Sequence, residues 1–519
     1  MARLHEHEGK KLLSQRGLAV PRGAVAGTAD MAYAAAAEIG GPVVLKIQAW
    51  TTGRAAIGGV AFADTPEEAR EHASRLLGMS VGAFPVDTVL VEEKIDIADE
   101  IFVSQTIDDG ERAPVMLVAF GGGSGIEERA DSVHRLPVDS ETGIDDAALT
   151  ALMASSPIAD ALRADVATAI QQIATTARDV EARSMEVNPL VTTTDGRVLA
   201  ADCRVTIDDY AVFRHPELGI RIARELDHPP TRLEEIAYDL EQRDHRGTFY
   251  FAVLPRTGEA GEKVIGFHGA GGGGSMMSMD AVSQAGFTPA NFTDTSGNPS
   301  AAKVYAAARI ILSQPGLVGY FGSGSGVASQ EQYWSAYGLA KAFNELHLSV
   351  PALIRLGGNS EDRAVEILED ACKDLPATVE GYKKDDPPRA IGERFTQLVD
   401  DAAGSVWEPT DRIVPAFVEG DGVKLCDVSM GDGWTGGVWL DAANLDDVQT
   451  QTVLKLAGDL LRVQDERLTL AITPEDAAKR DSDWIALEVE CLRAGVPAVF
   501  VDIPIDGLEA ELAVSEEAA

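Results

Sequence analysis

The sequence contains few cysteines, few basic residues and no long apolar run. Its four cysteines lie far apart without a CxxC pair, at Cys203, Cys372, Cys426 and Cys491. They predict reduced thiols rather than a disulfide framework or a zinc site. No uncharged apolar stretch approaches the roughly 18 residues of a membrane span, and the charged start "MARLHEHEGKKLL" lacks an apolar signal core. We therefore expect a cytoplasmic chain without a membrane partner.

Basic residues are outnumbered by acidic ones, with 44 Lys and Arg against 83 Asp and Glu and a formal net charge of −39. Such a chain repels phosphate groups at long range, which argues against a nucleic-acid partner. The acid excess by itself indicates little more than solubility. With 519 residues, 45% of them hydrophobic and only 6% aromatic, the chain is too long for one ordinary core, and two to four domains are expected.

Residues 1–235 alternate helix and strand signals. "EHEGKKLLSQRG" and "DMAYAAAAEIG" are helical and end at glycine, and Thr65 precedes Glu68 by three positions in a capping-box pattern. "PVVLKIQ", "DTVLVEE" and "RSMEVNPLVTT" have the composition of strands. This region predicts a mixed α and β domain.

Residues 240–385 show a different rhythm. The strands in "KVIGFHGAGGGGS", "LVGYFGSGSGVAS" and "VPALIRLGGNSED" each end in glycines and each lead into a helix. That is the layout of a doubly wound parallel sheet, whose binding site lies at the carboxyl ends of the strands.

Residues 395–519 follow an exposed connection. "DSDWIALEVECLRAG" has helical periodicity, and "LTLAITP" and "PAVFVDIP" have the pattern of buried strands. We expect a small third α/β domain, for which the sequence indicates no chemistry.

The stretch "SMEVNPLV" and the following "VLAADCRV" place Asn188 and Asp202 on successive strands, which a hairpin would make neighbours. Both side chains offer hard oxygen ligands, and one or two such ligands with phosphate oxygens would hold Mg²⁺. Asn-Pro is also an ordinary strand terminator, and a half-exposed Asp is common. The residues alone leave both interpretations open.

Several motifs in register resemble one family. "LHEHEGKKLLSQRGLAVPRG", "VVLKIQAWTTGRAAIGG", "MEVNPLVTTTDGRVLAADCRV", "PANFTDTSGN" and "LIRLGGN", in this order, are similar to the β subunit of succinyl-CoA synthetase, an ATP-grasp protein. The resemblance covers roughly residues 1 to 375. It implies an α/β chain with an N-terminal ATP-grasp fold and a flavodoxin-like, doubly wound CoA-ligase domain, to which the small C-terminal α/β domain is added.

The resemblance also assigns nucleotide contacts. Lys46 matches the lysine that meets the phosphates, as a cation aimed into a cleft can do. Gly53 and Arg54 fall in the glycine-rich phosphate loop, where backbone N–H groups approach the nucleotide. Glu92 matches the hinge where adenine or ribose is held, and Glu100 matches a further acid of the nucleotide site.

Asn188 and Asp202 match the family's metal-holding pair, and Glu186 lies on the same strand face as Asn188. The resemblance therefore implies a platform for Mg²⁺ and nucleotide, in which the metal offsets phosphate charge. This chain departs from the family at Ala56, which replaces the usual basic residue two positions after Arg54.

The glycine-rich strand ends of the second domain bind the carboxylate in this family. The resemblance assigns this role to His268, Gly269, Gly322 and Gly324. His268 stands where the family usually has Asn, and "FGSGSGVAS" also departs from the family pattern, so we expect a carboxylate other than succinate. His268 has three possible roles: a donor to the substrate, a stand-in phosphate acceptor that takes part in catalysis, or a structurally satisfied histidine.

The family's phosphohistidine and CoA-binding domain belong to a separate α-type subunit, and neither its GxGxxG nor its histidine loop occurs here. The resemblance thus predicts half of a hetero-oligomeric, ADP-forming acyl-CoA synthetase that works with Mg²⁺, ATP and CoA. Two alternatives stay open. One is a CoA-independent ATP-grasp ligase that joins a carboxylate to an amine, and the other is a non-catalytic regulatory subunit.

Overall fold

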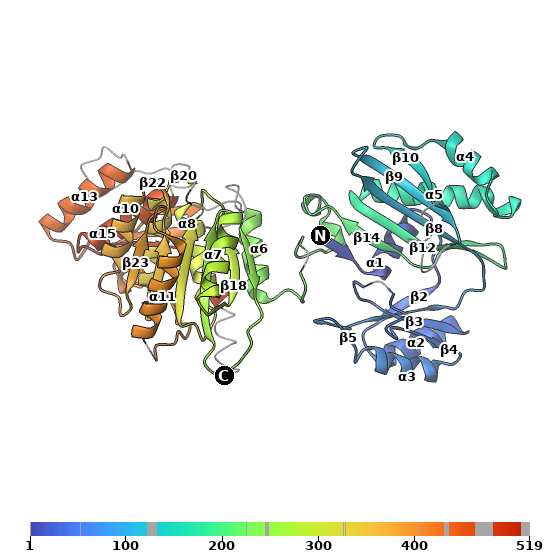
Figure 1. Ribbon diagram of the computed structural model, residues 1–519, viewed down its shortest axis with the longest axis horizontal. Helices are drawn as coiled ribbons and strands as arrows, with labels where there is room; N and C mark the ends of the chain where they lie inside the picture. The colour runs from blue at the N-terminus through green and yellow to red at the C-terminus, as the bar shows by residue number, and fades with distance from the viewer. Residues whose placement is uncertain are drawn as a thin grey trace. The chain divides into compact units, whose positions relative to one another are not determined.

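The structure is a computed structural model that describes residues 2–51, 53–121, 132–224, 226–243, 249–324, 326, 328–402, 404–429, 435–461 and 481–509. The chain divides into two compact units, Met1–Pro230 and Thr231–Ala519, and each is described by itself (Figure 1). The strand expected at "LTLAITP" lies outside the described residues.

The first unit contains a large and a small sheet. The large sheet has eight strands in the order β1-β14-β12-β8-β9-β10-β11, and β13 pairs with β12. Its strands are β1 (Ala2–Leu4), β8 (Ile97–Asp108), β9 (Ala113–Phe120), β10 (His134–Asp139), β11 (Gly143–Ile144), β12 (Ala182–Thr193), β13 (Val198–Ala200) and β14 (Arg204–Ile207). The small sheet has the order β2-β7-β3-β4 and consists of β2 (Gly23–Ala26), β3 (Val43–Ile47), β4 (Val60–Ala63) and β7 (Val89–Glu93).

The described residues of this unit also form the short hairpin of β5 (Ser80–Val81) and β6 (Phe84–Pro85), the α-helices α1 (Glu6–Gln15), α2 (Ala29–Ile39), α3 (Pro66–Leu76), α4 (Asp146–Ala154) and α5 (Arg163–Asp179), and the 3₁₀ turns η2 (Asp160–Leu162), η3 (Val212–Arg214) and η4 (Pro216–Leu218). Helices α2 and α3 cover one face of the small sheet (Figure 1). Their alanines and the sheet's valines and leucines form one core cluster.

Local sequence signals set these helix ends. The Thr28 hydroxyl accepts a hydrogen bond from Met31 N at the start of α2, and Gly40 ends that helix with φ of 74°, a conformation that glycine adopts without steric cost. The Thr65 hydroxyl accepts from Glu68 N at the start of α3. The cap predicted at Thr65 is therefore confirmed.

The second unit contains a seven-stranded sheet in the order β15-β18-β16-β19-β21-β23, with β17 paired to β16. Strands β16, β19, β21 and β23 run parallel, as expected for a doubly wound sheet. The strands are β15 (Tyr250–Val253), β16 (Lys263–Ala270), β17 (Phe287–Pro289), β18 (Asn291–Asp294), β19 (Gly319–Gly324), β21 (Ala352–Arg355) and β23 (Val379–Tyr382). A separate pair is formed by β20 (Ala328–Glu331) and β22 (Gly358–Asn359).

The helices that precede the C-terminal region are α6 (Arg232–Arg243), α7 (Gly273–Gln284), α8 (Ala301–Ile311), α9 (Tyr333–Glu345), α10 (Glu361–Cys372) and α11 (Pro388–Asp401). The C-terminal region adds α12 (Ala416–Glu419), β24 (Val423–Ser429), β25 (Thr435–Leu440), α13 (Asp447–Leu461), α15 (Asp481–Arg493) and β26 (Val499–Asp502). Strands β24, β25 and β26 form an antiparallel sheet.

Helix α15 packs against α8, α9 and α10. Every residue of α8 is buried, and the fully buried side chains of α15 belong to the same core cluster as those of α8 and α9. The described part of residues 395–519 thus shares a hydrophobic core with the parallel-sheet region. The division into domains at 1–235, 240–385 and 395–519 stays a prediction.

A buried ion cluster joins α9 to α15. The Lys341 ammonium, whose side chain is fully buried, bonds the carboxylates of Glu345 and of Glu488, the latter at 2.7 Å. Burial, together with the charge of Glu345, raises the pKa of Glu488 to about 7, although Lys341 opposes this shift. Two buried acids therefore share the Lys341 ammonium.

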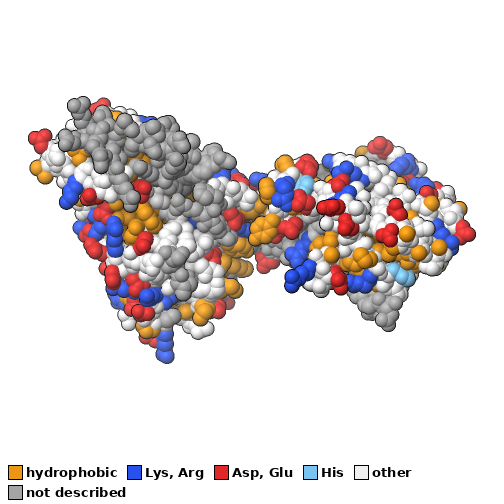
Figure 2. Space-filling model, turned by 90° about the horizontal axis from the view of Figure 1, so that it is seen from above, with side chains coloured by type: hydrophobic (Ala, Val, Ile, Leu, Met, Phe, Trp, Pro, Cys, Tyr) orange, Lys and Arg blue, Asp and Glu red, His pale blue; other side chains and the backbone are white. Residues whose placement is uncertain are grey.

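The described residues include no helix that is both long and apolar enough to cross a membrane. Acidic and basic side chains are interspersed over the face drawn in Figure 2.

Replacing Lys341 should destabilise the second unit strongly. In Lys341→Met, Glu345 and Glu488 lose their shared cation in a buried setting, which costs about 3–5 kcal/mol. Urea denaturation followed by tryptophan fluorescence measures the free energy of unfolding of the second unit. The signal reports mainly on that unit, because Trp50 is the one tryptophan before residue 231. As a control, Arg389→Met removes an exposed pair with Glu393 and should give no measurable change. An equal effect of both variants would contradict the role of the buried cluster.

Candidate functional site

Helix α1 brings two charged residues into the interior of the first unit. Its buried face consists of Glu6, Gly9, Lys10 and Leu13, which have the spacing of one helical stripe. A Cβ on Gly9 would lie 2.8 Å from Cys203 Sγ, so glycine lets the helix approach the strand that follows β13. Glu6 and Lys10 thereby face the small sheet rather than solvent.

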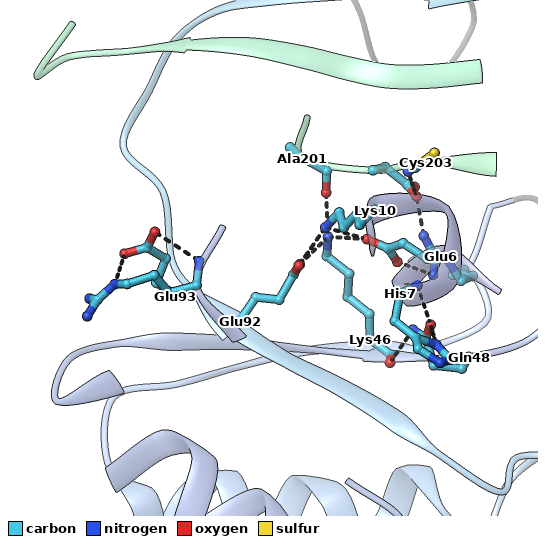
Figure 3. Close-up of polar contacts among 12 residues, drawn as sticks. Glu6, His7, Lys10, Lys46, Gln48, Glu92, Glu93, Ala201 and Cys203 are labelled. Atoms are coloured by element: carbon cyan, nitrogen blue, oxygen red, sulfur yellow. Dashed lines mark hydrogen bonds and ion pairs between the residues drawn. The ribbon is translucent and has the colours of Figure 1, made fainter. Parts of the chain in front are cut away.

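Lys46 lies on β3, and its ammonium contacts three acceptors. Its Nζ is 2.8 Å from Glu6 Oε1, 2.7 Å from the Ala201 carbonyl oxygen and 3.0 Å from Glu92 Oε2. The first two contacts are hydrogen bonds and the third is an ion pair. Figure 3 shows the side chains of Lys46, Lys10, Glu6 and Glu92 converging from α1, β3 and β7.

Arg54 lies in the loop between β3 and β4, next to Gly53 with φ of 64°. Its Nη1 donates to Glu6 Oε2 at 2.5 Å, and its Nη2 donates to Asp202 Oδ2 at 2.7 Å. At the start of the same loop, the Trp50 indole stacks on the His5 ring with centroids 4.9 Å apart. The loop is thus tied to α1 by one ion pair and one ring stack.

Of the predicted metal pair, Asn188 lies on β12 and Asp202 lies between β13 and β14. Leu190 on β12 is paired with Ala200 on β13, Glu186 is paired with Arg204 on β14, and Ala201 N donates to the Pro189 carbonyl oxygen at 3.0 Å. Continuing this register between the two pairs would put Asn188 across from Asp202. Among the residues that the structure describes, no group of three or more His, Cys, Asp or Glu side chains has metal-binding geometry. Two facing oxygen donors fit a Mg²⁺ whose remaining ligands are phosphate and water oxygens.

The cluster shifts the pKa of its members through burial and opposite charge. Burial would raise the pKa of Glu6, but Lys46, Lys10 and Arg54 outweigh it and hold this pKa far below its usual value. Burial would lower the pKa of Lys46, yet Glu6, Glu92 and Asp202 raise it above its usual value. Lys46 therefore stays charged at every physiological pH, as a phosphate-binding lysine must.

The cluster has an accessible front and a buried back. The partly exposed side chains are those of Lys46 (15%), Arg54 (11%) and Asp202 (25%). The side chains that solvent hardly reaches, at 2–4%, are those of Glu6, Lys10 and Glu92. The three front residues are those that the sequence predicted to meet phosphate and metal. The six side chains together carry three positive and three negative charges.

Sequence reasoning missed Glu6 and Lys10 and gave Glu92 a different role. The Lys10 ammonium lies 2.6 Å from Glu92 Oε1 and 2.8 Å from Glu6 Oε1. Both residues share the buried stripe of α1 with Leu13, but charged residues near a helix start have the composition of a solvated face, so the sequence alone did not mark them. Glu100 lies on β8 opposite Val191 of β12, and its carbonyl oxygen accepts from Gly121 N at 2.8 Å.

His268 lies on β16 and is buried. Its Nδ1 is 2.6 Å from the Tyr320 hydroxyl, and its Nε2 is 3.2 Å from Thr295 Oγ1. Burial lowers the pKa of His268 to about 4, although Asp294 opposes this shift. Both nitrogens of a neutral ring thus have protein partners, and this geometry favours the structural role among the three alternatives. Participation in catalysis stays a prediction.

The predicted substrate glycines differ in what surrounds them. A Cβ on Gly269 would lie 2.4 Å from Ser275 Cβ and 2.7 Å from the Thr293 carbonyl oxygen, so close packing requires glycine there. A Cβ on Gly322 would lie 2.9 Å from Ile354 Cδ1, the end of a flexible side chain that can shift. A Cβ on Gly324 would have no neighbour closer than 3.6 Å. Packing therefore does not account for Gly324, which stays a candidate for substrate contact.

A cavity at the carboxyl ends of β16, β19 and β21 is lined by His268, Thr295, Gly322, Ser323, Gly324, Gln332 and Arg355, with apolar side chains behind them. Among its described lining residues, Arg355 is the only charged one. Arg355 Nε also donates to the Lys383 carbonyl oxygen at 3.3 Å, which holds the guanidinium in place. Sequence reasoning gave Arg355 no role, although it is a lone cation at the end of a buried strand.

Comparison with known families identifies the class of the first unit. Residues 3–192 match the model of the ATP-grasp domain. The chain is 34% identical over 371 residues to the succinate–CoA ligase [GDP-forming] subunit beta of Thermus thermophilus, covering 70% of this chain and 93% of that protein. It is 32% identical over 383 residues to the succinate–CoA ligase [ADP-forming] subunit beta of Rubrobacter xylanophilus, covering 73% and 95%.

This chain belongs to the succinate–CoA ligase β-subunit family. The predicted resemblance and enzyme class, an ATP-grasp acid–thiol ligase of the kind that uses Mg-ATP and CoA, are confirmed. A solved structure of ATP citrate lyase from Methanothrix soehngenii, in complex with citrate and coenzyme A, covers 76% of this chain and 99% of its own, with a TM-score of 0.62 and 18% identity. That likeness shows the fold, and the predicted fold class is confirmed.

The His268 ring should stay neutral across the physiological range. Its folded pKa of about 4 lies below the ordinary 6.5, so between these values the unfolded chain binds the proton and the folded chain does not. The contribution of the neutral, buried ring to the free energy of unfolding is therefore complete above pH 6.5 and is lost as the pH falls towards 4. Histidine-selective NMR, with the signal assigned by its loss in His268→Gln, should show no titration between pH 8 and about 5. A midpoint near 6.5 would contradict the buried, hydrogen-bonded ring.

Proposed function

We propose that this chain is the nucleotide-binding β-type subunit of an ADP-forming acyl-CoA synthetase. It uses Mg-ATP to activate a small carboxylate other than succinate, through a phosphohistidine on a CoA-binding, α-type partner subunit. The observation that carries this proposal is the partly exposed group formed by Lys46, Arg54 and Asp202, with Asn188 opposite Asp202. Two cations and two oxygen ligands on one front match a metal-bound polyphosphate.

In the proposed first step, Lys46 and Arg54 orient the β- and γ-phosphates and offset their charge. Asn188 and Asp202 would hold Mg²⁺, which supplies charge neutralisation during transfer. The partner's histidine nitrogen attacks the γ-phosphorus, the bond to the bridging oxygen breaks, and ADP leaves. Because transfer of this kind depends on position and electrostatics, it requires no acid or base from this chain.

In the proposed second step, the carboxylate occupies the cavity of the second unit. Arg355 pairs with its charge, and the hydroxyls of Ser323 and Thr295 offer hydrogen bonds. A carboxylate oxygen attacks the phosphohistidine to give an acyl phosphate and free histidine. The CoA thiolate then attacks the acyl carbon, and inorganic phosphate leaves. Splitting the condensation in this way replaces one difficult step by easier ones.

The expectation of a carboxylate other than succinate rests on His268. With both ring nitrogens committed to Tyr320 and Thr295, this position presents a different surface from the amide that the family usually has.

We place the reaction in the cytoplasm, in a hetero-oligomer with the partner subunit. The four cysteines are free, and Cys203, Cys372 and Cys491 are buried, which suits a reducing compartment.

Substrate and partner are tested together by measuring ADP release. The chain is purified alone and with a co-expressed α-type subunit and assayed over a panel of small carboxylates, with and without CoA. We expect turnover only with both the partner and CoA, and a carboxylate other than succinate as the best substrate. Turnover by the chain alone without CoA would indicate a carboxylate–amine ligase instead. Nucleotide binding without turnover in any arm would indicate a regulatory subunit.

The metal role of Asp202 predicts a selective loss. Asp202→Asn keeps the shape of the side chain and removes its charge, so ATP-dependent turnover should fall at least about a hundredfold. The gain in ADP affinity on adding Mg²⁺, measured by calorimetry, should also disappear. Asp195→Asn is the control, because Asp195 lies in the turn between β12 and β13 and pairs with Arg197. An unchanged metal dependence in Asp202→Asn would remove Asp202 from the site.

A further inference from the structure

The two cations at the front of the cluster already contact acids of the chain itself. Lys46 has three acceptors within 3.0 Å, and Arg54 is shared between Glu6 and Asp202. Asp202, in turn, accepts from Arg54 with Oδ2 and from Cys203 N with Oδ1. The cations that would bind phosphate and the carboxylate that would bind metal therefore neutralise one another.

Glu6 is the residue that links these cations. Its Oε1 contacts Lys10 and Lys46, both at 2.8 Å, and its Oε2 contacts Arg54 at 2.5 Å. With its side chain 2% exposed, it lies behind the two front cations and is out of reach of a ligand in the cleft. A phosphate that binds at the front must compete with this carboxylate for the same N–H donors.

We infer that Glu6 is an internal counter-anion of the nucleotide site, which competes with the phosphates for Lys46 and Arg54 and so limits how tightly nucleotide is held. This inference rests on the proposed nucleotide function. The same contacts couple metal binding to nucleotide binding. Because Arg54 pairs with Asp202, Asp202 becomes available for Mg²⁺ only when a phosphate binds Arg54 instead. When ADP departs, Glu6 and Asp202 bind the two cations again, which favours product release.

If Glu6 served only to hold Lys46 and Arg54 in place, removing its charge would weaken nucleotide binding. The remaining partners of the two cations argue that they stay in place without it. Lys46 would still be held by Glu92 and by the Ala201 carbonyl if Glu6 lost its charge. Arg54 would likewise be held by Asp202 and, at 3.2 Å, by the Ile47 carbonyl. Because both cations keep other partners, removing the charge of Glu6 frees N–H donors without releasing the side chains. The six-residue cluster would change from neutral to a net charge of +1.

The test is a calorimetric titration of ADP, with EDTA present to exclude metal, into the full-length chain and its variants. Glu6→Gln should bind ADP at least about tenfold more tightly than the wild-type chain, a difference of about 1.4 kcal/mol. Glu93→Gln is the matched control, because Glu93 is also on β7 but pairs with Arg22 and Arg197 instead, as Figure 3 shows by its separate set of contacts. Its ADP affinity should equal that of the wild type.

A second variant guards against loss of the fold in Glu6→Gln. Glu6→Asp keeps the charge but withdraws the carboxylate by one methylene from Lys46 and Arg54, so it should tighten ADP binding by a smaller factor. Thermal unfolding of each variant is recorded beside the titration. If a folded Glu6→Gln or Glu6→Asp binds ADP as weakly as the wild type, or more weakly, Glu6 positions the cations and the inference is wrong.

The same titrations separate this inference from the function on which it rests. If the wild-type chain binds ADP with Mg²⁺ but the Glu6 variants bind it no more tightly, only the counter-anion role fails. If neither the wild type nor any folded variant binds ADP with or without Mg²⁺, the nucleotide function itself fails.

Discussion

The first unit depends on one buried carboxylate that meets three cations. Glu6 receives Lys10, Lys46 and Arg54, which come from α1, from β3 and from the loop after β3. A charged group in such a setting is tolerated only with paired partners, and removing a partner leaves a buried charge that costs several kcal/mol. The cluster therefore fixes where the helix, the small sheet and the loop after β3 meet. The same constraint gives the site two accessible cations at its front.

The second unit applies a different constraint, which is steric. Gly269 is required because Ser275 and the Thr293 carbonyl leave no room for a Cβ. At the loop after β16, the Asp294 carboxylate accepts hydrogen bonds from the backbone N–H groups of Gly271 and Gly272. An internal acid thus occupies donors that would otherwise attract an anion. Among the described lining residues, Arg355 remains as the cation that faces the cavity. In both units, carboxylates of the chain itself bind N–H donors that a ligand would otherwise contact.

Much of the fold was predictable because its signals are local. The glycine-ended strands predicted the parallel sheet, and the cap at Thr65 predicted the start of α3. Lys46, Arg54, Glu92 and Asp202 were singled out by motifs, and the structure brings all four together.

Glu6 and Lys10 escaped prediction because charged residues at a chain start have the composition of a solvated helix face. Only the packing of α1 against Cys203, which lies 197 residues after Glu6 and 193 after Lys10 in the sequence, shows that this face is buried. The partners of His268 were unpredictable for the same reason: Tyr320 and Thr295 come from other elements of the sheet. Long-range pairings of this kind carry no signature in local sequence.

The most direct measurement of the central claim is a crystal structure of the chain with ADP and Mg²⁺. The account predicts that the phosphates contact Lys46 Nζ and the Arg54 guanidinium, and that a metal is held by Asn188 and Asp202. It further predicts that Arg54 has left Asp202, with Glu6 still behind the two cations. Phosphates bound elsewhere in the first unit, with the ion pairs of Glu6 and Asp202 unchanged, would contradict it.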